Sequence, residues 1–597
     1  MIILDFEVFK YDWLMVYIDT DNQDIGSIEN DPEKLKKLYE ANRKSLWVGY
    51  NINHYDKYIF KAILLGIDPK YVNDEIIIYG KDGWQISREF NKIPMVIYDV
   101  YSTKLPGLKT LEGFMGNNIK ETTIPFNIDR KLTDDELTEV LHYCESDVLN
   151  TFDVFMENID TFNAFLGVIE AFPEQLSVNN LADTEAQLTS NVLECERHEW
   201  DDEFDFFFLP CLRLNKYKCV QDWFAQFIGK KFKNTTEKDT FYKTTSLTID
   251  VAGVSHTFGF GGMHGAPNEP IHVIGGLFHV DANNYYPSLL LANNLVTRSA
   301  NNDNFRVIYN TRKALKYKQT HAKDKTEAKQ YKKAQLPYKL ILNALSGAMK
   351  DPKNKAYDPR NNNCMCINGQ LMLLDLIEHL EVIPGFRLIQ SNTDGLIVKI
   401  PDTDKAFDML DDICYEWEVR CSTDLCDIRL ETDQIREIYQ KDVNNYLWID
   451  LDGGIERKGA YVKELSRLDN DLPIVNEALV RYMVDKTPVK TTITECNEYI
   501  KFQKLVKLSP KYTYVEHNGI RYDNKCYRVF ASLNAKDGKI LKCRSISSPA
   551  KFGNTPDSCY IDNDTVNGKP IPDKLDKQWY IDLALKRLND FGIKAPH

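Results

Sequence analysis

Two acidic residues near the start of the chain are spaced so that they could bind metal ions together. Asp5 and Glu7 are separated by one residue within residues 2–9, a stretch that predicts a β-strand. Successive side chains of a strand point to opposite faces, so both carboxylates lie on one face. For an isolated pair, a solvent-exposed face is the simpler interpretation. Further acids in the same segment favour a metal site instead.

Those further acids are Asp56, which follows a short apolar strand at residues 46–50, and Asp147. Asp147 lies four residues after Tyr143 in a predicted helix over residues 133–158, so the two share a helix face. Four carboxylates can bind two divalent cations, which hold a phosphodiester, generate hydroxide and stabilise the leaving oxygen. A tyrosine hydroxyl can orient the attacking water. This set of residues is typical of phosphodiester hydrolysis.

A second pair of acids lies in the middle of the chain. Asp281 ends a predicted strand at residues 276–280, and Asp394 lies in the turn of a predicted hairpin over residues 387–400. An acid at a strand end and an acid at a hairpin tip can meet on one sheet and bind two Mg²⁺ ions for nucleotidyl transfer. An ordinary hairpin turn is the alternative interpretation of the second acid.

Between these two acids lies the most basic part of the chain, residues 305–350, which predicts two helices. Arg312 and Lys316 are four residues apart in the first helix, and Lys339 and Asn343 are four residues apart in the second. Cations facing a carboxylate–metal site would neutralise the charge that develops on a leaving pyrophosphate. A solvated, lysine-rich helical hairpin is the alternative.

The first set of motifs resembles the three exonuclease motifs of DEDDy-type proofreading domains: DxE, then an asparagine–aspartate motif from Asn51 to Asp56, then YxxxD. The resemblance implies an RNase H-like fold and 3′→5′ exonuclease activity. It also implies metal binding by Asp5, Glu7, Asp56 and Asp147, water positioning by Tyr143 and positioning of the substrate strand by Asn51.

The second set resembles the polymerase motifs of family B DNA polymerases. The stretch DANNYYPS at residues 281–288 is similar to motif A, KLILNALSG at 339–347 to motif B and SNTDG at 391–395 to motif C. The resemblance implies two Mg²⁺ ions per active site, with Mn²⁺ as the alternative. It implies metal binding by Asp281, Asp394 and the carbonyl of Ala282, and a steric gate at Tyr286. It implies that the triphosphate is bound by Arg312, Lys316, Lys339 and Asn343.

Three positions depart from these motifs. Asn392 stands where motif C has its first aspartate, Ser346 replaces the tyrosine of motif B, and Asn284 replaces the serine of motif A. From Asn392 we expect weaker metal occupancy, and Ser346 puts base-pair checking in doubt. The glycine-rich loop at residues 259–265 lies where the family has its YxGG loop.

The predicted fold class is α+β and multidomain, with an RNase H-like exonuclease domain followed by a right-hand polymerase of palm, fingers and thumb. Periodicity predicts strands at residues 2–9 and 13–19 and a mixed sheet in the first domain, and it predicts helices at residues 371–379 and 579–591. The predicted divisions are an exonuclease domain at residues 1–165, a connecting region at 166–255, palm at 256–304, fingers at 305–350, palm again at 351–460, and thumb and C-terminal region at 461–597.

The intervals from Asp281 to Lys339 and from Lys339 to Asp394 leave little room for the insertions of protein-primed members of the family. The resemblance therefore implies a DNA-directed DNA polymerase of compact phage or mobile-element type, which extends an ordinary primer. Its partners would be primer–template DNA, dNTPs and a single-stranded 3′ end in the exonuclease site. The alternatives are a protein-primed polymerase, a nuclease with a degenerate polymerase half and an inactive nucleic-acid-binding protein.

Net charge and composition further limit the class of protein. The formal net charge of −14 argues against a histone-like binder, and the thirteen cysteines include no CxxC pair, so a zinc module is not expected. We expect reduced thiols in a bacterial host cytoplasm, no signal peptide and no membrane span, because no apolar run reaches about 18 residues.

Overall fold

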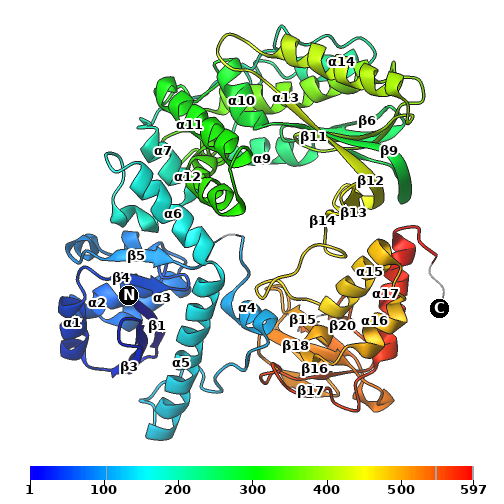
Figure 1. Ribbon diagram of the computed structural model, residues 1–597. Helices are drawn as coiled ribbons and strands as arrows, with labels where there is room; N and C mark the ends of the chain where they lie inside the picture. The colour runs from blue at the N-terminus through cyan, green and yellow to red at the C-terminus, as the bar shows by residue number, and fades with distance from the viewer. Residues whose placement is uncertain (103, 545–546, 595–597) are drawn as a thin grey trace.

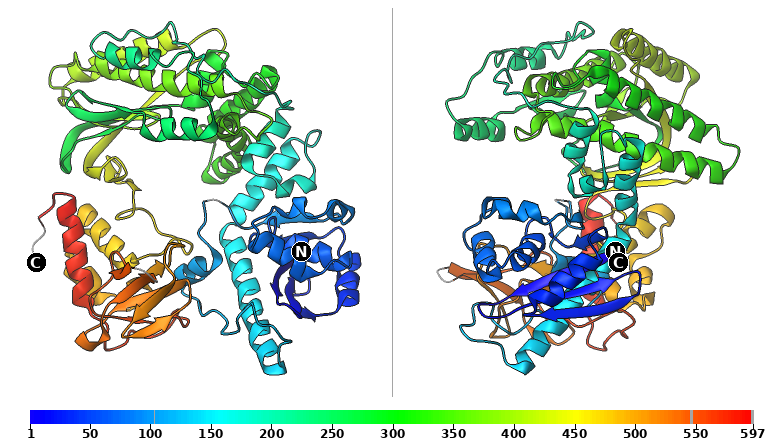
Figure 2. Two further views of the ribbon diagram at one scale, coloured as in Figure 1. Left: turned by 180° about the vertical axis from the view of Figure 1, so that it is seen from behind. Right: turned by 90° about the vertical axis from the view of Figure 1, so that its left-hand side faces the viewer.

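The computed structural model describes residues 1–102, 104–544 and 547–594. It has three parts, which we call the N-terminal part (residues 1–158), the central part (159–458) and the C-terminal part (459–594). The N-terminal and C-terminal parts both lie on one side of the central part (Figures 1 and 2). The structure is therefore mixed α and β in several parts. Among the described residues, no helix is long and apolar enough to span a membrane.

The N-terminal part is built on a five-stranded sheet of order β3-β2-β1-β4-β5. The central strand β1 is antiparallel to β2 and parallel to β4, which confirms the mixed sheet expected from the sequence. The strands are β1 (Ile2–Val8), β2 (Trp13–Asp19), β3 (Asp24–Glu29), β4 (Leu46–Gly49) and β5 (Val96–Asp99). The helices are α1 (Pro32–Ala41), α2 (Asp56–Leu64), α3 (Pro69–Ile77), α4 (Leu108–Met115) and α5 (Asp134–Glu157).

Helix α5 begins where the sequence predicts. The Thr133 side chain accepts a hydrogen bond from the Glu136 backbone, and the Glu136 side chain accepts one from the Thr133 backbone. This reciprocal capping box satisfies two backbone donors that the first turn of a helix leaves unpaired. The helix packs against β1 and β2 on the face of the sheet that carries the first acids.

Residues 166–255, the predicted connecting region, lack a clear periodic pattern, and the structure explains why. Residues 201–217 run largely as coil over α13 (Pro359–Leu380), where polar side chains of that helix bind their backbone. Asn368 accepts from the Leu209 N–H at 2.9 Å, and Asp375 accepts from the Arg213 N–H at 2.5 Å. The elements of this stretch are α6 (Ile159–Ala171), α7 (Glu185–Val192), α8 (Lys218–Ala225), α9 (Thr235–Thr244), β6 (Leu247–Val251) and β7 (Val254–Phe258).

The expected limits at 165 and 255 fall inside elements. Residue 165 lies within α6, which packs against α12 (Lys325–Lys350) of the central part. Residue 255 lies within β7, and the β6–β7 hairpin belongs to the same sheet as Asp281. The stretch from 166 to 255 therefore contributes two strands to that sheet in addition to connecting the parts.

The central part is built on a nine-stranded sheet of order β14-β13-β12-β9-β11-β10-β8-β7-β6. Strand β9 lies in its middle, paired antiparallel with β11 on one side and β12 on the other. The predicted hairpin at residues 387–400 is confirmed as β10 and β11. The strands not yet given are β8 (His264–Ala266), β9 (Ile271–Ala282), β10 (Arg387–Ser391), β11 (Gly395–Lys399), β12 (Leu430–Asp442), β13 (Asn445–Asp450) and β14 (Ile455–Lys458).

Helices α10 (Tyr285–Ala292), α13 and α14 (Asp404–Cys421) cover one face of this sheet (Figure 1). The two predicted basic helices are confirmed as α11 (Asn302–Thr320) and α12, which pack against each other. Helix α13 is much longer than the predicted segment 371–379. Its first half is rich in asparagine, which lowers the apolar signal, yet Asn361, Asn363 and Asn368 are buried and hydrogen-bonded.

The described residues of the C-terminal part form two small sheets and three α-helices. The first sheet is β15 (Lys504–Lys507), β18 (Cys526–Ala531) and β21 (Cys559–Ile561). The second is β16 (Tyr514–His517), β17 (Ile520–Tyr522), β19 (Ile540–Arg544) and β20 (Ser547–Lys551). The helices are α15 (Pro473–Asp485), α16 (Val489–Glu495) and α17 (Lys577–Asp590), the last within two residues of the predicted 579–591.

Candidate active sites

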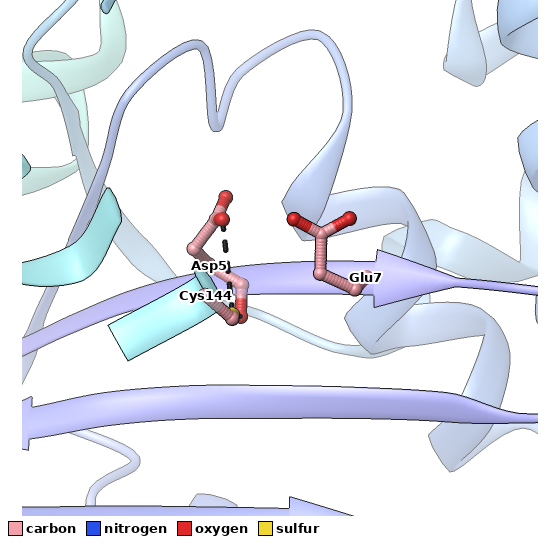
Figure 3. A group of neighbouring side chains, drawn as sticks. All are labelled: Asp5, Glu7 and Cys144. Atoms are coloured by element: carbon pink, nitrogen blue, oxygen red, sulfur yellow. Dashed lines mark hydrogen bonds between the residues drawn. The ribbon is translucent and has the colours of Figure 1, made fainter. Parts of the chain in front are cut away.

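The structure brings the four acids of the first set together beside the N-terminal sheet. Asp5 and Glu7 project from the same side of β1, as Figure 3 shows. Asp56 comes from the start of α2 and Asp147 from the middle of α5. Burial raises the pKa values of Asp5 and Glu7 well above their usual range, and the negative charges of the neighbouring acids raise them further. Asp5 and Glu7 are therefore within electrostatic reach of Asp56 and Asp147. Among the described residues, the closely spaced ligand group that contains Asp5 and Glu7 does not include Asp56 or Asp147.

Local geometry explains the position of Asp56, which is only 2% exposed. Strand β1 pairs with β4 only at its first residues, so the Phe6 N–H lies beyond the end of β4. Asp56 accepts a hydrogen bond from that N–H at 3.2 Å. Burial raises the pKa of Asp56 to about 7, opposed by its backbone hydrogen bonds. The acid is thus tied to the strand that carries Asp5 and Glu7.

Asn51 lies at the turn between β4 and α2 in a left-handed conformation, with φ of 68°. Asp99, at the end of β5, accepts hydrogen bonds from the backbone N–H groups of Asn51 and Asn53 at 2.8 and 2.9 Å. Asparagine tolerates this conformation better than most residues. Asn51 is therefore held by its backbone at the end of β5 and is itself half-buried.

Two charged residues of this site were not predicted from the sequence. Lys109 and Glu112 lie on α4, where the Lys109 ammonium donates hydrogen bonds to Asp147 and, at 3.2 Å, to Glu112. The ammonium also lies 4.5 Å from the centre of the Tyr143 ring. Burial acts to lower the pKa of Lys109, but Asp147 and Glu112 outweigh it and raise that pKa. Lys109 is thus a fixed positive charge among the acids.

Cys144 also borders the acids. Its thiol lies 3.5 Å from the Asp5 carbonyl oxygen and 3.8 Å from a carboxylate oxygen of Asp5. Burial, followed by the charges of Asp5 and Glu7, raises the pKa of this thiol well above its usual range. A neutral thiol donates to Asp5 and orients it. Among the described residues, Asp5, Glu7 and Cys144 form the group whose ligand atoms lie close enough to share one metal ion.

The second set of acids meets in the middle of the central sheet. Asp281 is opposite Gly395 in the β9–β11 pairing, and the Ala282 N–H donates to the Asp394 carbonyl at 2.9 Å. A Cβ atom added at Gly395 would lie 2.8 Å from a carboxylate oxygen of Asp281. A side chain at position 395 would therefore clash with the Asp281 carboxylate, which packs directly against the hairpin. Burial, then Asp394, Glu431 and Asp433, raise the pKa of Asp281 to about 7.

Glu431 and Asp433 were not predicted. They lie on β12, opposite Asp281 and His279 respectively, so all four side chains are on one face of the sheet. Their spacing of one residue within a strand is the signal that identified Asp5 and Glu7. It was available in the sequence at residues 431–433.

The hairpin tip is shaped by Asn392 and by the glycine-rich loop. The Asn392 side-chain oxygen accepts from the N–H groups of Asp394 at 3.2 Å and Gly395 at 2.9 Å. A Cβ atom added at Gly262 would lie 2.7 Å from the Thr393 hydroxyl, so the loop packs directly on the tip. In this structure the Asn392 side chain therefore stabilises the turn that contains Asp394.

Two of the four predicted triphosphate-binding residues reach this site. On α11, Arg312 donates to the Asn284 side chain, and Lys316 lies 2.8 Å from Glu431 and 3.2 Å from the Asn283 side chain. Arg312 is 9% exposed. Lys339 and Asn343 lie on α12, exposed, and neither side chain has a hydrogen-bond or ion-pair partner among the described residues. Both remain open to a ligand.

Tyr286 lies at the start of α10, between the hairpin and α13. Its ring centre is 5.6 Å from that of Tyr285, which donates a hydrogen bond to the Gly369 carbonyl at 2.6 Å. A Cβ atom added at Gly369 would lie 3.2 Å from the Tyr286 ring. Helix α13 therefore packs closely against the Tyr286 ring. Burial, followed by the nearby Cys366 and Asp394, raises the pKa of Tyr286.

Both clusters suit divalent cations. Buried carboxylates that repel one another are stabilised by positive charge, and carboxylate oxygens are the ligands that Mg²⁺ and Mn²⁺ prefer. The candidate donors are Asp5, Glu7, Asp56 and Asp147 in one cluster and Asp281, Asp394 and Glu431 in the other. The two clusters lie on different sheets.

Comparisons with known proteins give little beyond this geometry. No protein-family model matches the chain, and no curated protein sequence matches it. Among solved structures, the chain is similar to a family B DNA polymerase from the hyperthermophilic archaeon Pyrobaculum calidifontis, with 12% sequence identity and a TM-score of 0.42, over 98% of this chain and 77% of that one. At that identity and TM-score the likeness supports no conclusion about the reaction.

Proposed function

We propose that the protein is a template-directed DNA polymerase that adds dNTPs to a primer 3′ end and carries its own 3′→5′ proofreading exonuclease. One observation carries this proposal: two separate carboxylate clusters form on two sheets, and each contains the acids that the exonuclease or polymerase motifs identify. The N-terminal part would be the exonuclease, and the central part would be the palm and fingers.

In the exonuclease, Asp5, Glu7, Asp56 and Asp147 would hold two Mg²⁺ or Mn²⁺ ions, which supply an activated water and stabilise the leaving oxygen. Tyr143 would orient that water. Burial raises the pKa of Tyr143, so its hydroxyl stays protonated and can donate. Asn51 would contact the single-stranded 3′ end. Lys109 offsets part of the negative charge that the phosphate group must approach.

In the polymerase, Asp281 and Asp394, with the carbonyl of Ala282, would hold two ions that lower the pKa of the primer 3′ hydroxyl and stabilise the pyrophosphate. Glu431 adds a third carboxylate, and Lys316 beside it keeps a cation at the same edge. Arg312, Lys316, Lys339 and Asn343 would bind the triphosphate. The first two would exchange their contacts with Asn284 and Glu431 for phosphate oxygens.

The primer would be an ordinary nucleic acid. Between Asp281 and Asp394 the chain forms α10 to α13 and β10 in close succession, without a further folded insertion among the described residues. This compactness supports primer extension over protein priming. A phage or mobile-element origin, with action in a bacterial host cytoplasm, stays a prediction.

A primer-extension assay tests the proposal. We expect the protein with Mg²⁺ and dNTPs to extend a matched primer on a template. It should shorten a primer with a mismatched 3′ end before extending it, and EDTA should stop both reactions. Shortening without extension under any condition would favour the nuclease with a degenerate polymerase half. Extension that requires a protein hydroxyl as primer would favour the protein-primed alternative.

The Tyr286 side chain gives a sharper test of the polymerase site. Tyr286→Ala should raise ribonucleotide incorporation relative to deoxyribonucleotide by about tenfold or more, because the ring would no longer fill the space beneath the sugar C2′. The measurement is the ratio of single-turnover rNTP and dNTP incorporation rates. Tyr286→Phe keeps the ring and is the matched control, with an unchanged ratio. An unchanged ratio in Tyr286→Ala would remove this residue from the role of gate.

A further inference from the structure

Helix α4 connects the exonuclease candidate site to the C-terminal part. It lies between the N-terminal sheet and strands β15 and β18 (Figure 1). Its first turn carries Lys109, which contacts Asp147. Leu111 and Met115 pack into the core shared with α5. An isolated helix of eight residues is not stable in water, so its neighbours must determine its position.

The C-terminal end of α4 is held by residues far away in the sequence. The last carbonyl groups of a helix have no partner within the helix. Here Asn470 and Gln503 donate to the Phe114 carbonyl, both at 3.2 Å. Asn567 donates to the Met115 carbonyl at 2.7 Å. The C-terminal part therefore supplies the hydrogen bonds that α4 cannot make itself.

Arg528 on β18 makes the most extensive of these contacts. One terminal nitrogen donates to the Gly113 and Asn117 carbonyls, at 3.1 and 2.8 Å. The other donates to the Asp564 carbonyl at 2.6 Å, and Nε donates to the Gln503 side chain at 2.9 Å. The side chain is 0% exposed. A buried cation at a helix C-terminus also interacts favourably with the helix dipole.

The packing leaves α4 little freedom to shift. A Cβ atom added at Gly113 would lie 2.8 Å from the Leu505 side chain of β15. Val566 donates its N–H to the Gly116 carbonyl at 2.9 Å, and Ile119 donates to the Asn563 carbonyl at 3.0 Å. The segment from Gly113 to Ile119 is thus fitted to the C-terminal part along its whole length.

We propose that Arg528 is a positioning residue for the exonuclease: by holding the C-terminal end of α4, it places the Lys109 ammonium against Asp147. The inference rests on the proposed exonuclease function. It means that the C-terminal part, which the polymerase resemblance assigns to the thumb, sets the charge balance of a site in a different part of the chain. Arg528 acts through Lys109 and does not itself touch the substrate.

Arg528→Met should reduce the single-turnover exonuclease rate on single-stranded DNA by about tenfold or more, as loss of residues that orient metal-site side chains typically does. Primer extension should stay within about twofold of wild type. Tyr580→Phe is the matched control. It removes a buried hydroxyl that donates to Phe502 and accepts from the N–H of Ala531, on the same strand as Arg528, and it does not touch α4. Its exonuclease rate should be unchanged.

Two further measurements separate positioning from general destabilisation. In hydrogen–deuterium exchange without added metal, amides of residues 111–119 should exchange faster in Arg528→Met and not in Tyr580→Phe. In a double-mutant cycle, adding Arg528→Met to Lys109→Met should change the exonuclease rate by less than about twofold, because the two act through one contact. If Arg528→Met does not fold, Asn567→Ala removes the part-buried hydrogen bond to the Met115 carbonyl of α4 and should show the same effects at smaller size.

The outcomes are distinct. If the wild-type protein has no exonuclease activity that depends on Asp5 and Glu7, the proposed function fails. If wild-type activity depends on those acids and Arg528→Met keeps the full rate, the positioning role is wrong. Multiplicative losses in the double mutant would also overturn it, because they would mean that Arg528 acts independently of Lys109.

Discussion

Replacing Asp394 by alanine should reduce primer extension by about 10³-fold or more. The residue lies at the hairpin tip where its backbone carbonyl accepts from Ala282 and where Asp281 packs against the next residue. Ions held between the two carboxylates supply several kcal/mol of charge stabilisation in phosphoryl transfer, and each 1.4 kcal/mol is about tenfold in rate. The rate of single-nucleotide addition under single-turnover conditions measures the effect.

Asn392→Ala is the matched control at the same turn. It removes an acceptor from two backbone N–H groups, each hydrogen bond contributing about 1 kcal/mol, so we expect extension to fall about tenfold and to remain measurable. Degradation of single-stranded DNA should be unchanged in both variants. Comparable extension by Asp394→Ala and wild type would mean that the catalytic partner of Asp281 lies elsewhere. If Asn392→Asp speeds extension, an acid at this position assists metal binding.

The double variant Asp5→Asn with Glu7→Gln should reduce 3′→5′ degradation by about 10³-fold or more while primer extension stays close to wild type. Both side chains keep their size but lose the charge that holds divalent cations. The two clusters belong to different sheets, so the loss should not reach Asp281 and Asp394. Degradation of a labelled single strand and extension of a matched primer give the two rates.

Thermal unfolding provides the control for folding. Burial and mutual repulsion raise the pKa values of Asp5 and Glu7, so keeping them ionised at neutral pH costs stability that the neutral amides do not. Without divalent cations, the variant should therefore unfold at the same temperature as wild type or higher. Added Mg²⁺ should raise the unfolding temperature of wild type more than that of the variant. If the folded variant lost both 3′→5′ degradation and primer extension, the proposal of two independent active sites would be wrong.

Much of the secondary structure could be predicted because its signals are local. Strand β2 matches its predicted bounds, and α5 agrees within one residue because a capping box marks its start. Helix α13 was predicted at less than half its length, because the asparagines of its first half find their partners in residues 203–209, about 160 positions away. No local pattern could show that these polar side chains would be buried.

The same distinction applies to the sites. The spacing of Asp5 and Glu7 on a strand, and of Tyr143 and Asp147 on a helix, places each pair on one face before any tertiary contact forms. Glu431 and Asp433 carry the same strand signal. Their position beside Asp281 depends on the pairing of β12 with β9, because only this register sets Glu431 opposite Asp281.

Residue type and periodicity were sufficient to place Asp5 with Glu7, and Tyr143 with Asp147, on one face of their predicted elements, because those properties depend on neighbours a few positions away. The position of Lys109 among the acids depends instead on hydrogen bonds from Asn470, Gln503, Arg528 and Asn567 to the end of α4. Those partners are more than 350 residues distant. A short helix with no stability of its own takes the position that its tertiary contacts impose, and no pattern within residues 108–115 contains that information.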